Sequence, residues 1–229
     1  VLQGLKGSNV QFGRAFYRQI SMHGQLATEF IEAFYNVSYN QNGIDKLKID
    51  QARFARKKRD SSLVFISYNN FSILSVGYDL YTPSAVSIGK PFCEPFFEYY
   101  EFQVKAEYER DSNHFVEVAF YPSEELSNKV NSRGHFIYNT SRQQLVEYVA
   151  TVDHGLGADN LQGSIPNKKL TVENPNCTWK VSFSDTDGLV NFILVDYRYD
   201  LIADLQTIPS RVFSRTFFYQ TRSNPHKNL

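Results

Sequence analysis

Long hydrophobic runs are missing from this chain of 229 residues. No stretch approaches the roughly 18 consecutive apolar residues that a membrane-crossing helix needs, so we predict no such helix. The first residues, Val1-Leu2-Gln3, also lack the positively charged and apolar regions of a signal peptide. We therefore expect the sequence to be a mature or excised segment.

A surplus of charge of either sign is also missing, because 24 basic residues balance 24 acidic ones. A nucleic-acid-binding protein needs an excess of Lys and Arg to displace counterions, so the neutral balance predicts no nucleic-acid partner. Apolar residues make up 42% of the chain and charged residues 21%, a composition typical of globular proteins rather than disordered tails.

The motifs of enzymes and metal sites are missing as well. None of the histidines lies within four residues of another histidine or of a cysteine, so the spacing of zinc ligands is absent. No Gly-x-Ser-x-Gly elbow and no glycine-rich phosphate loop occur. We predict no enzyme activity and no metal or other cofactor, and an active site assembled from distant residues remains the alternative. The histidines are His23, His114, His135, His154 and His226.

One acidic segment, Asp185-Thr186-Asp187-Gly188, has the appearance of the first half of a calcium loop. It lacks the further oxygen ligands and the closing Glu at the twelfth position, where Asp196 or Tyr197 stands instead. As a turn between two strands the segment is complete. We therefore predict a turn, with calcium binding as the less favoured alternative.

Cysteine is scarce, and Cys93 and Cys177 allow one intramolecular pairing. A disulfide between these residues, 84 positions apart, contributes about 3 to 4 kcal/mol in the chain-entropy model. Asn-x-Ser/Thr triplets begin at Asn36, Asn70, Asn139 and Asn176 and are predicted glycosylation sites. Together these features favour a secreted or lumenal glycoprotein; a cytosolic protein with two free thiols is the alternative.

Aromatic residues are abundant, with 19 Phe and 15 Tyr. They alternate most clearly between Asn176 and Leu201, where Trp179, Val181 and Phe183 share one face. This pattern predicts a half-buried strand, Asp187-Gly188 supplies a tight turn, and the apolar return run predicts a central strand. We expect this hairpin to form the middle of an antiparallel sheet.

A second hairpin is predicted around Asn42-Gly43, where a strand from Leu26 to Tyr39 turns back. The odd-numbered residues of that strand are expected to be buried, and a bulge is expected between Ile44 and Leu47. The basic run Arg56-Lys57-Lys58-Arg59 favours a solvated loop, or a patch for anionic headgroups, over a processing site.

The remaining pattern predicts a mainly β fold of roughly ten antiparallel strands with little helix, arranged in curved sheets as a half-barrel or a sandwich. Residues 11–23 fit a short helix or a strand equally. Loops are predicted over 155–176 and, because of Pro209, over 203–213. Further strands are predicted over 62–68, 71–81, 96–108, 114–121 and, as a pair, 133–152. The expected division is an N-terminal segment 1–25, a single β domain 26–213 and a C-terminal tail 214–229.

The order of these motifs resembles the ependymin-related and LolA-like group of secreted proteins. The matching features are the strand Phe30–Tyr39 with Asn42-Gly43 and a basic return strand, then Cys93-Glu94-Pro95-Phe96, Asn176–Val181 and Ile208–Phe213. The resemblance implies a curved antiparallel sheet pair with a hydrophobic pocket, an extracellular location, an association with calcium and often a dimer. It implies no enzyme activity.

We therefore predict a non-catalytic extracellular protein that binds an apolar or lipid-like ligand in a β-sheet cavity. The alternative is a structural or adhesive domain whose rings fill the core and whose partner is a second copy or another extracellular protein. Alternation of apolar residues selects five candidate pocket residues: Tyr35, Phe102, Trp179, Phe183 and Tyr197.

Overall fold

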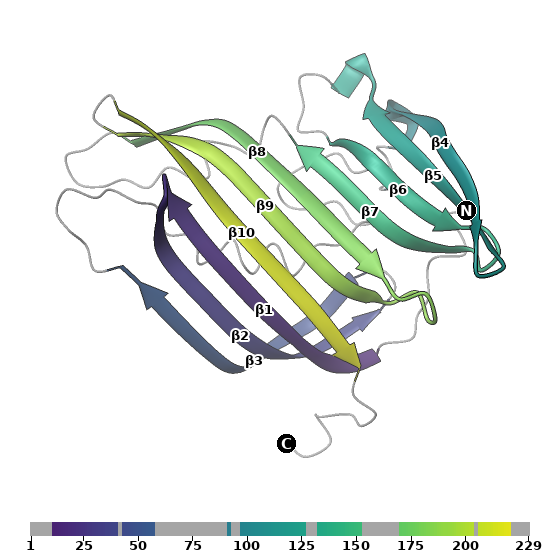
Figure 1. Ribbon diagram of the computed structural model, residues 1–229, viewed down its shortest axis with the longest axis horizontal. Helices are drawn as coiled ribbons and strands as arrows, with labels where there is room; N and C mark the ends of the chain where they lie inside the picture. The colour runs from purple at the N-terminus through teal and green to yellow at the C-terminus, as the bar shows by residue number, and fades with distance from the viewer. Residues whose placement is uncertain are drawn as a thin grey trace.

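A computed structural model describes residues 11–40, 43–57, 91–92, 97–126, 132–152, 170–203 and 206–220. In these ranges the chain forms one antiparallel sheet of ten strands and two 3-10 turns, with no α-helix (Figure 1). No described helix is long and apolar enough to cross a membrane. The strands are β1 (Gln11–His23), β2 (Leu26–Asn40), β3 (Gly43–Arg56), β4 (Tyr100–Arg110), β5 (Asn113–Pro122), β6 (Arg133–Asn139), β7 (Gln144–Val152), β8 (Leu170–Phe183), β9 (Val190–Ala203) and β10 (Gln206–Gln220).

The strands lie in the order β3-β2-β1-β10-β9-β8-β7-β6-β5-β4, so the β8–β9 hairpin occupies the centre of the sheet. This confirms the prediction made from its alternating rings. Gly188 has a φ of 70°, which a residue without a Cβ adopts at little cost. The turn is closed where the Ser184 amide donates to the Leu189 carbonyl at 2.8 Å.

The first and the last described strands are neighbours inside the sheet, because β1 pairs with β10 from Gly13↔Gln220 to His23↔Ser210. Residues 11–23, whose sequence fits a helix and a strand equally, therefore form a strand. The predicted loop over 203–213 and tail from 214 were wrong over the described residues, since β10 runs from Gln206 to Gln220.

Pro209 misled that prediction, and the register shows why the strand tolerates it. Pairing with β1 begins only at Ser210, so Pro209 has no strand partner on that side. Its carbonyl accepts a hydrogen bond from the Gly24 amide at 2.6 Å, at the turn after β1. Since the amide and carbonyl of a strand residue point the same way, the N–H that proline lacks would have pointed beyond the end of β1.

Pro175 lies inside β8, which begins at Leu170 and so includes part of the predicted loop 155–176. The register with β9 shifts between Glu173 and Asn176, and Asn174 has a φ of 50°. A bulge therefore accommodates the proline. The predicted bulge near Ile44 is confirmed, since the β2–β3 register shifts between Ser38 and Tyr39.

We call one side of the sheet the buried face. Its residues are neighbours across successive strands, as in Ile193↔Val181↔Tyr148↔Phe136. The described strands form this single layer and not the facing pair of a sandwich. The buried face holds one continuous cluster that includes Tyr17, Ala33, Val37, Phe120, Tyr148, Val152, Trp179, Val181, Ile193, Val195, Tyr197 and Leu201.

The predicted disulfide is not present in the structure, where Cys177 is a free and fully buried thiol. Its neighbours on the buried face are Val152 of β7 and Tyr197 of β9. The pairing had been inferred from the number of cysteines, which does not determine where either side chain lies. Cys93 is outside the described residues, as are Asn70, the predicted strands 62–68 and 71–81, and the basic residues Lys58 and Arg59.

Candidate functional site

The predicted pocket residues fall mainly in one place. Trp179, Phe183 and Tyr197 are buried in the cluster on the buried face, and Tyr35 packs against it. Burial raises the pKa of the Tyr35 hydroxyl, and burial together with Tyr199 and Cys177 raises that of Tyr197, so both phenols are neutral. Phe102 instead lies on edge strand β4, half-exposed and stacked on Phe97 at 5.1 Å.

A band of polar side chains crosses this apolar face on β1 and β10, and we call it the polar seam. Every one of its members is buried. The strand register aligns them, for example Gln19 with Ser214 and His23 with Ser210. The polar seam comprises Gln19, Ser21, His23, Ser210, Ser214 and Thr216.

Hydrogen bonds connect the polar seam along β1. The Tyr17 hydroxyl donates to Gln19 Oε1 at 2.5 Å, and Gln19 Nε2 donates to Ser21 Oγ at 3.4 Å. His23 Nδ1 lies 3.2 Å from Ser210 Oγ. Burial lowers the pKa of His23 to about 4, so its imidazole is uncharged at neutral pH.

Glu29 of β2 lies at the edge of the polar seam, directly opposite Ser21. Its side chain is 0% exposed, and Arg56 Nε lies 3.3 Å from Oε1. The contact lacks hydrogen-bond geometry, and neither carboxylate oxygen has a hydrogen-bond partner in the described chain. A buried carboxylate is costly without hydrogen-bond donors, so Glu29 is the polar group here that most needs a further partner.

The opposite side of β1, β2, β3, β9 and β10, which we call the exposed face, carries aligned aromatic rings on four of these strands. Phe16 lies opposite both Phe34 and Phe217, and Phe217 lies opposite Phe192. Ring centroids are 5.0 Å apart in the Phe16–Phe34 pair and in the Phe192–Phe217 pair. This phenylalanine row, formed by these four residues, crosses four strands.

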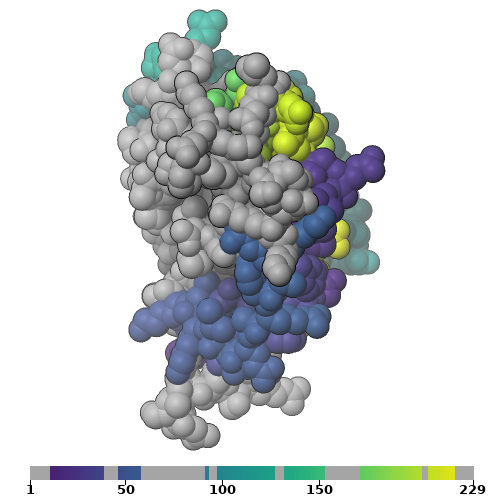
Figure 2. Space-filling model, turned by 90° about the vertical axis from the view of Figure 1, so that its left-hand side faces the viewer, coloured from purple at the N-terminus to yellow at the C-terminus, as the bar shows by residue number. Residues whose placement is uncertain are grey.

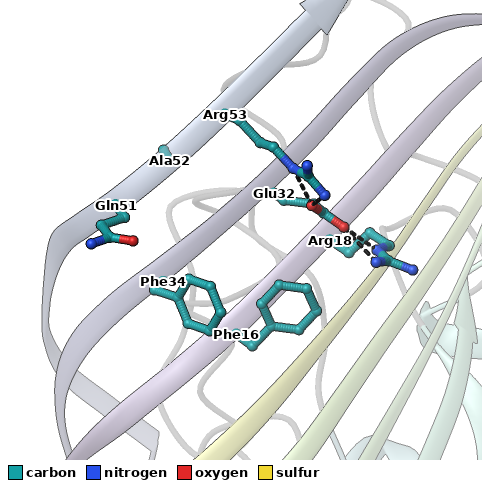
Figure 3. Close-up of a pocket in the computed structure, with 7 residues that line it drawn as sticks. All are labelled: Phe16, Arg18, Glu32, Phe34, Gln51, Ala52 and Arg53. Atoms are coloured by element: carbon teal, nitrogen blue, oxygen red, sulfur yellow. Dashed lines mark hydrogen bonds and ion pairs between the residues drawn. The ribbon is translucent and has the colours of Figure 1, made fainter.

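An arginine row lies two residues along the same strands. Arg53, Glu32, Arg18 and Arg215 occupy successive positions across β3, β2, β1 and β10. Arg18 Nε donates to Glu32 Oε1 at 2.6 Å, and Arg53 pairs with Oε2 (Figure 3). Burial alone would raise the pKa of the Glu32 carboxyl, but the hydrogen bonds and charges of Arg53 and Arg18 hold it below its ordinary value.

A shallow hollow of about 380 Å³ lies between these two rows at the β3 side of the sheet. Figure 3 shows the Phe16 and Phe34 rings beside one another, next to Glu32 held between its two arginines. Figure 2 shows the surface of the N-terminal strands, in purple and blue, beside that of β10, in yellow. The hollow is lined by Phe16, Arg18, Glu32, Phe34, Gln51, Ala52 and Arg53.

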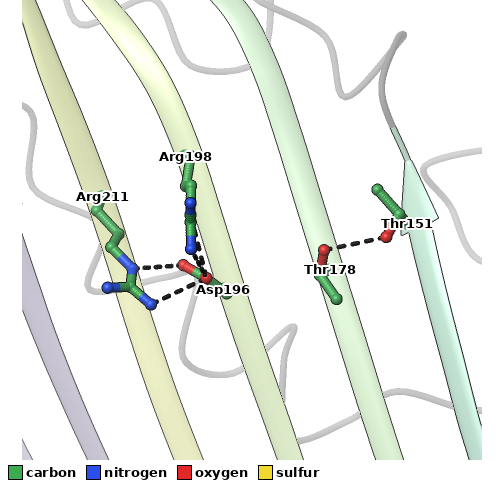
Figure 4. A network of polar contacts seen from close by, with 5 residues as sticks. All are labelled: Thr151, Thr178, Asp196, Arg198 and Arg211. Atoms are coloured by element: carbon green, nitrogen blue, oxygen red, sulfur yellow. Dashed lines mark hydrogen bonds and ion pairs between the residues drawn. The ribbon is translucent and has the colours of Figure 1, made fainter.

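A second carboxylate shared by two arginines lies further along this face. Arg211 donates through Nε and Nη2 to the two oxygens of Asp196 at 2.6 and 2.9 Å, and Arg198 Nη2 donates at 2.8 Å (Figure 4). These arginines lower the pKa of the Asp196 carboxyl, although its partial burial acts in the opposite direction. Next to Asp196 in the register, the hydroxyls of Thr178 and Thr151 lie 3.0 Å apart.

The three predicted glycosylation sites that the structure describes lie on strands or their ends. Asn36 and Asn176 are partly buried and stay predictions. Asn139 is 2% exposed, its Nδ2 donates to Asn113 at 3.4 Å and its Oδ1 accepts from the Arg142 amide. A sugar on Asn139 would have to break these contacts, so burial argues against glycosylation there.

Asp185 to Gly188 form the turn of the central hairpin, where Asp187 Oδ1 accepts from the Leu189 amide at 3.1 Å. Among the described residues no group of three or more His, Cys, Asp or Glu side chains is placed to hold a metal ion. Calcium at this turn therefore gains no support.

Sequence reasoning missed the exposed face because it followed each strand separately. A signal was nevertheless present, since Arg14-x-Phe16-x-Arg18 on β1 and Arg211-x-Phe213-x-Arg215 on β10 repeat one alternation. Both runs place arginine and phenylalanine on the same side of a strand.

No family model matches the chain, and neither does any curated protein. What is established of the fold is therefore the single ten-stranded antiparallel sheet.

Proposed function

We propose that this protein is a non-catalytic binding protein that holds an apolar, lipid-like ligand against the buried face of its sheet. The observation that supports this most directly is the continuous cluster of rings and aliphatic side chains on that face. Sheet faces this rich in rings and aliphatic side chains can line a cavity for hydrocarbon. We place the ligand chain along Trp179 and Tyr197, which are 6% and 0% exposed.

The ligand is amphipathic, because the polar seam crosses the apolar face. Binding sites for lipid-like molecules combine an apolar lining with a few oriented polar groups. Gln19 and Glu29 provide those groups, and the Glu29 carboxylate favours a hydroxyl or amine at the polar end of the ligand. The hydrocarbon part then lies toward the central strands β9 and β8.

Catalysis is not part of this proposal, although His23 and Ser210 lie within hydrogen-bond distance. The Ser210 hydroxyl also donates to the Ile208 carbonyl at 3.0 Å, and a histidine with a pKa of about 4 is a weak base at neutral pH. Burial, with the nearby Asp196 charge, raises the pKa of the Cys177 thiol, which keeps it protonated and a poor nucleophile. We therefore assign these groups to structure.

The proposed location is extracellular or lumenal, supported by the glycosylation triplets at Asn36 and Asn176 and by the resemblance to ependymin-related and LolA-like proteins. A disulfide no longer supports it, because Cys177 is free. Intact-mass measurement before and after glycosidase treatment of the protein made in a secreting eukaryotic host tests this location. A mass that does not change would contradict it.

Native mass spectrometry of the purified protein, followed by lipid extraction, tests ligand binding. We expect a co-purifying or exchangeable hydrophobe that exchanges with added long-chain alcohols or amines. Gln19→Leu should weaken binding of those amphiphiles about ten-fold by removing a buried hydrogen bond, whereas Gln103→Leu on exposed β4 should not. The absence of any bound or exchangeable hydrophobe would contradict the proposal.

A second candidate function is adhesion through protein contacts, and the exposed face favours it. Half-exposed rings and arginines are the residue types that dominate protein interfaces. Analytical ultracentrifugation tests self-association, and a strictly monomeric protein that binds a hydrophobe would exclude the homodimer.

A further inference from the structure

We propose that the exposed face of β1, β2, β3, β9 and β10 docks the protein on an anionic lipid membrane. This goes beyond ligand binding, because it concerns the opposite side of the sheet and different residues. Three observations support it: the phenylalanine row, the excess of arginine on the same face, and the placement of the guanidinium groups over the rings.

The phenylalanine row provides the apolar part of the contact. Phe34 is 41% exposed and Phe217 is 38% exposed, and Tyr219 extends the exposed aromatic surface along β10. Because Phe16 lies between Phe34 and Phe217 in the register, the rings form one continuous strip across the strands. Aromatic rings of this kind partition into the headgroup region of a bilayer.

The arginines around this strip outnumber the carboxylates that pair with them. Glu32 is shared by Arg18 and Arg53, and Asp196 is shared by Arg198 and Arg211. Each of these clusters therefore carries a net positive charge.

Arg215 adds a further positive charge to the face. It lies directly opposite Arg18, and its guanidinium group lies over the Phe213 ring, 4.9 Å from the ring centroid. Like charges facing each other across strands are unfavourable, and in this pair the described ion pairs give a carboxylate, Glu32, to Arg18 alone. The exposed face therefore calls for an anionic partner.

The same charges decide between partners. A second copy of this face would bring arginine against arginine, so symmetric face-to-face pairing is disfavoured. Stacked nucleobases need free ring faces, whereas Arg14 lies over Phe34 and Arg18 over Phe16, at 5.6 and 5.7 Å from the centroids.

A protein partner would anchor a side chain in a well-closed pocket, whereas the hollow here is shallow and the charges are spread over five strands. The anionic headgroups of a bilayer can move to each of these spread charges, and the apolar layer below the headgroups can accept the exposed rings. A bilayer containing anionic lipid therefore fits the face best.

Vesicle sedimentation with the full 229-residue chain tests the proposal. Vesicles of phosphatidylcholine alone are compared with vesicles that contain about one third phosphatidylserine. We expect binding to the anionic vesicles only, weakening as salt is raised, because headgroup attraction is screened. Equal binding to both compositions, or no binding to either, would overturn the proposal.

Variants place the contact on this face. Arg215→Gln should lower the partition coefficient of the protein between anionic vesicles and buffer about five-fold, the effect of removing one basic charge near an anionic surface. Phe217→Ser should lower this coefficient by a larger factor. The matched control is Lys105→Gln with Tyr121→Ser, a cation and ring in contact at 5.8 Å on strands β4 and β5. Equal losses in control and test variants would contradict docking through the exposed face.

Two further measurements distinguish membrane docking from binding to an acidic protein and from the proposed binding of a hydrophobe. If the protein binds soluble polyglutamate but not anionic vesicles, the partner of the exposed face is an acidic protein and not a membrane. That result would overturn the proposal. Arg215→Gln should leave the exchange of bound hydrophobe unchanged, so loss of vesicle binding and failure of the proposed ligand function are recognised separately.

Discussion

Phe217 and Phe218 are consecutive on β10, yet they belong to surfaces of opposite character. Phe218 lies in the apolar cluster of the buried face, whereas Phe217 belongs to the phenylalanine row among arginines. Strand alternation therefore lets one segment contribute to two different surfaces, one apolar and buried and one rich in arginine and exposed rings. The same holds on β1, where Tyr17 and Gln19 point to one side and Phe16 and Arg18 to the other.

The largest expected difference between the faces is in packing energy. Phe218→Ala should destabilise the protein by about 3 to 5 kcal/mol, because it removes a buried ring and leaves a cavity. Phe217→Ala removes a ring that keeps 38% of its surface in water and should cost about 1 kcal/mol or less. Urea unfolding measures both, and equal costs would contradict the division into two faces.

The polar seam should make the buried face sensitive to acid. The folded-state pKa of His23 is about 4, below the ordinary value of 6.5. Between these values the unfolded chain binds a proton that the folded protein does not, so stability is full above pH 6.5 and is lost as the pH falls. The loss should approach about 3 kcal/mol.

Urea unfolding at a series of pH values measures this loss. His23→Gln should flatten the dependence, whereas His114→Gln, on the more exposed β5, should leave it in place. An unchanged profile in the His23 variant would contradict the assignment.

The Cys177 thiol should be inaccessible on the buried face. A thiol reagent should modify Cys177 no faster than the protein unfolds, because the side chain is fully buried and its pKa is raised. Cys177→Ala should cost about 1 to 2 kcal/mol as a small cavity. A denatured, unreduced protein whose Cys177 still fails to react would instead indicate a disulfide.

The smallest effect is expected from the ion pairs of the exposed face. Arg211 and Arg198 lower the pKa of Asp196, so its contribution to stability is present at neutral pH and is lost as the pH falls below the ordinary value of 3.8. Solvent screening limits the effect of Asp196→Asn to less than about 1 kcal/mol at neutral pH. Unfolding in low and high salt measures it, with Asp185→Asn on the hairpin turn as the control.

Local pattern was enough to predict the centre of the sheet. The rings of β8, the Asp-Gly turn and the doubly apolar β9 are features of neighbouring residues, and all three are confirmed. The Cys93–Cys177 disulfide was not predictable in the same way, because it depends on distant placement.

The ends of the sheet needed information that local pattern does not contain. Pro209 breaks a strand unless its missing N–H points past the end of a neighbour, and that neighbour, β1, is almost 200 residues away in sequence. The phenylalanine row depends on the same long-range register. Three of the five predicted pocket rings are buried together and Tyr35 packs against them, whereas Phe102 lies opposite the buried Phe120 but is half-exposed on edge strand β4. Alternation alone does not tell an edge strand from a central one.

The central claim is that a hydrocarbon chain lies against the buried face, and Trp179 reports on it directly because it is the one tryptophan in the chain. A dibrominated fatty alcohol quenches tryptophan only near contact, whereas its unbrominated parent does not. We predict saturable quenching of Trp179 by the brominated ligand, with one equivalent bound and full reversal by the parent alcohol. Undiminished fluorescence at saturating ligand would contradict the account.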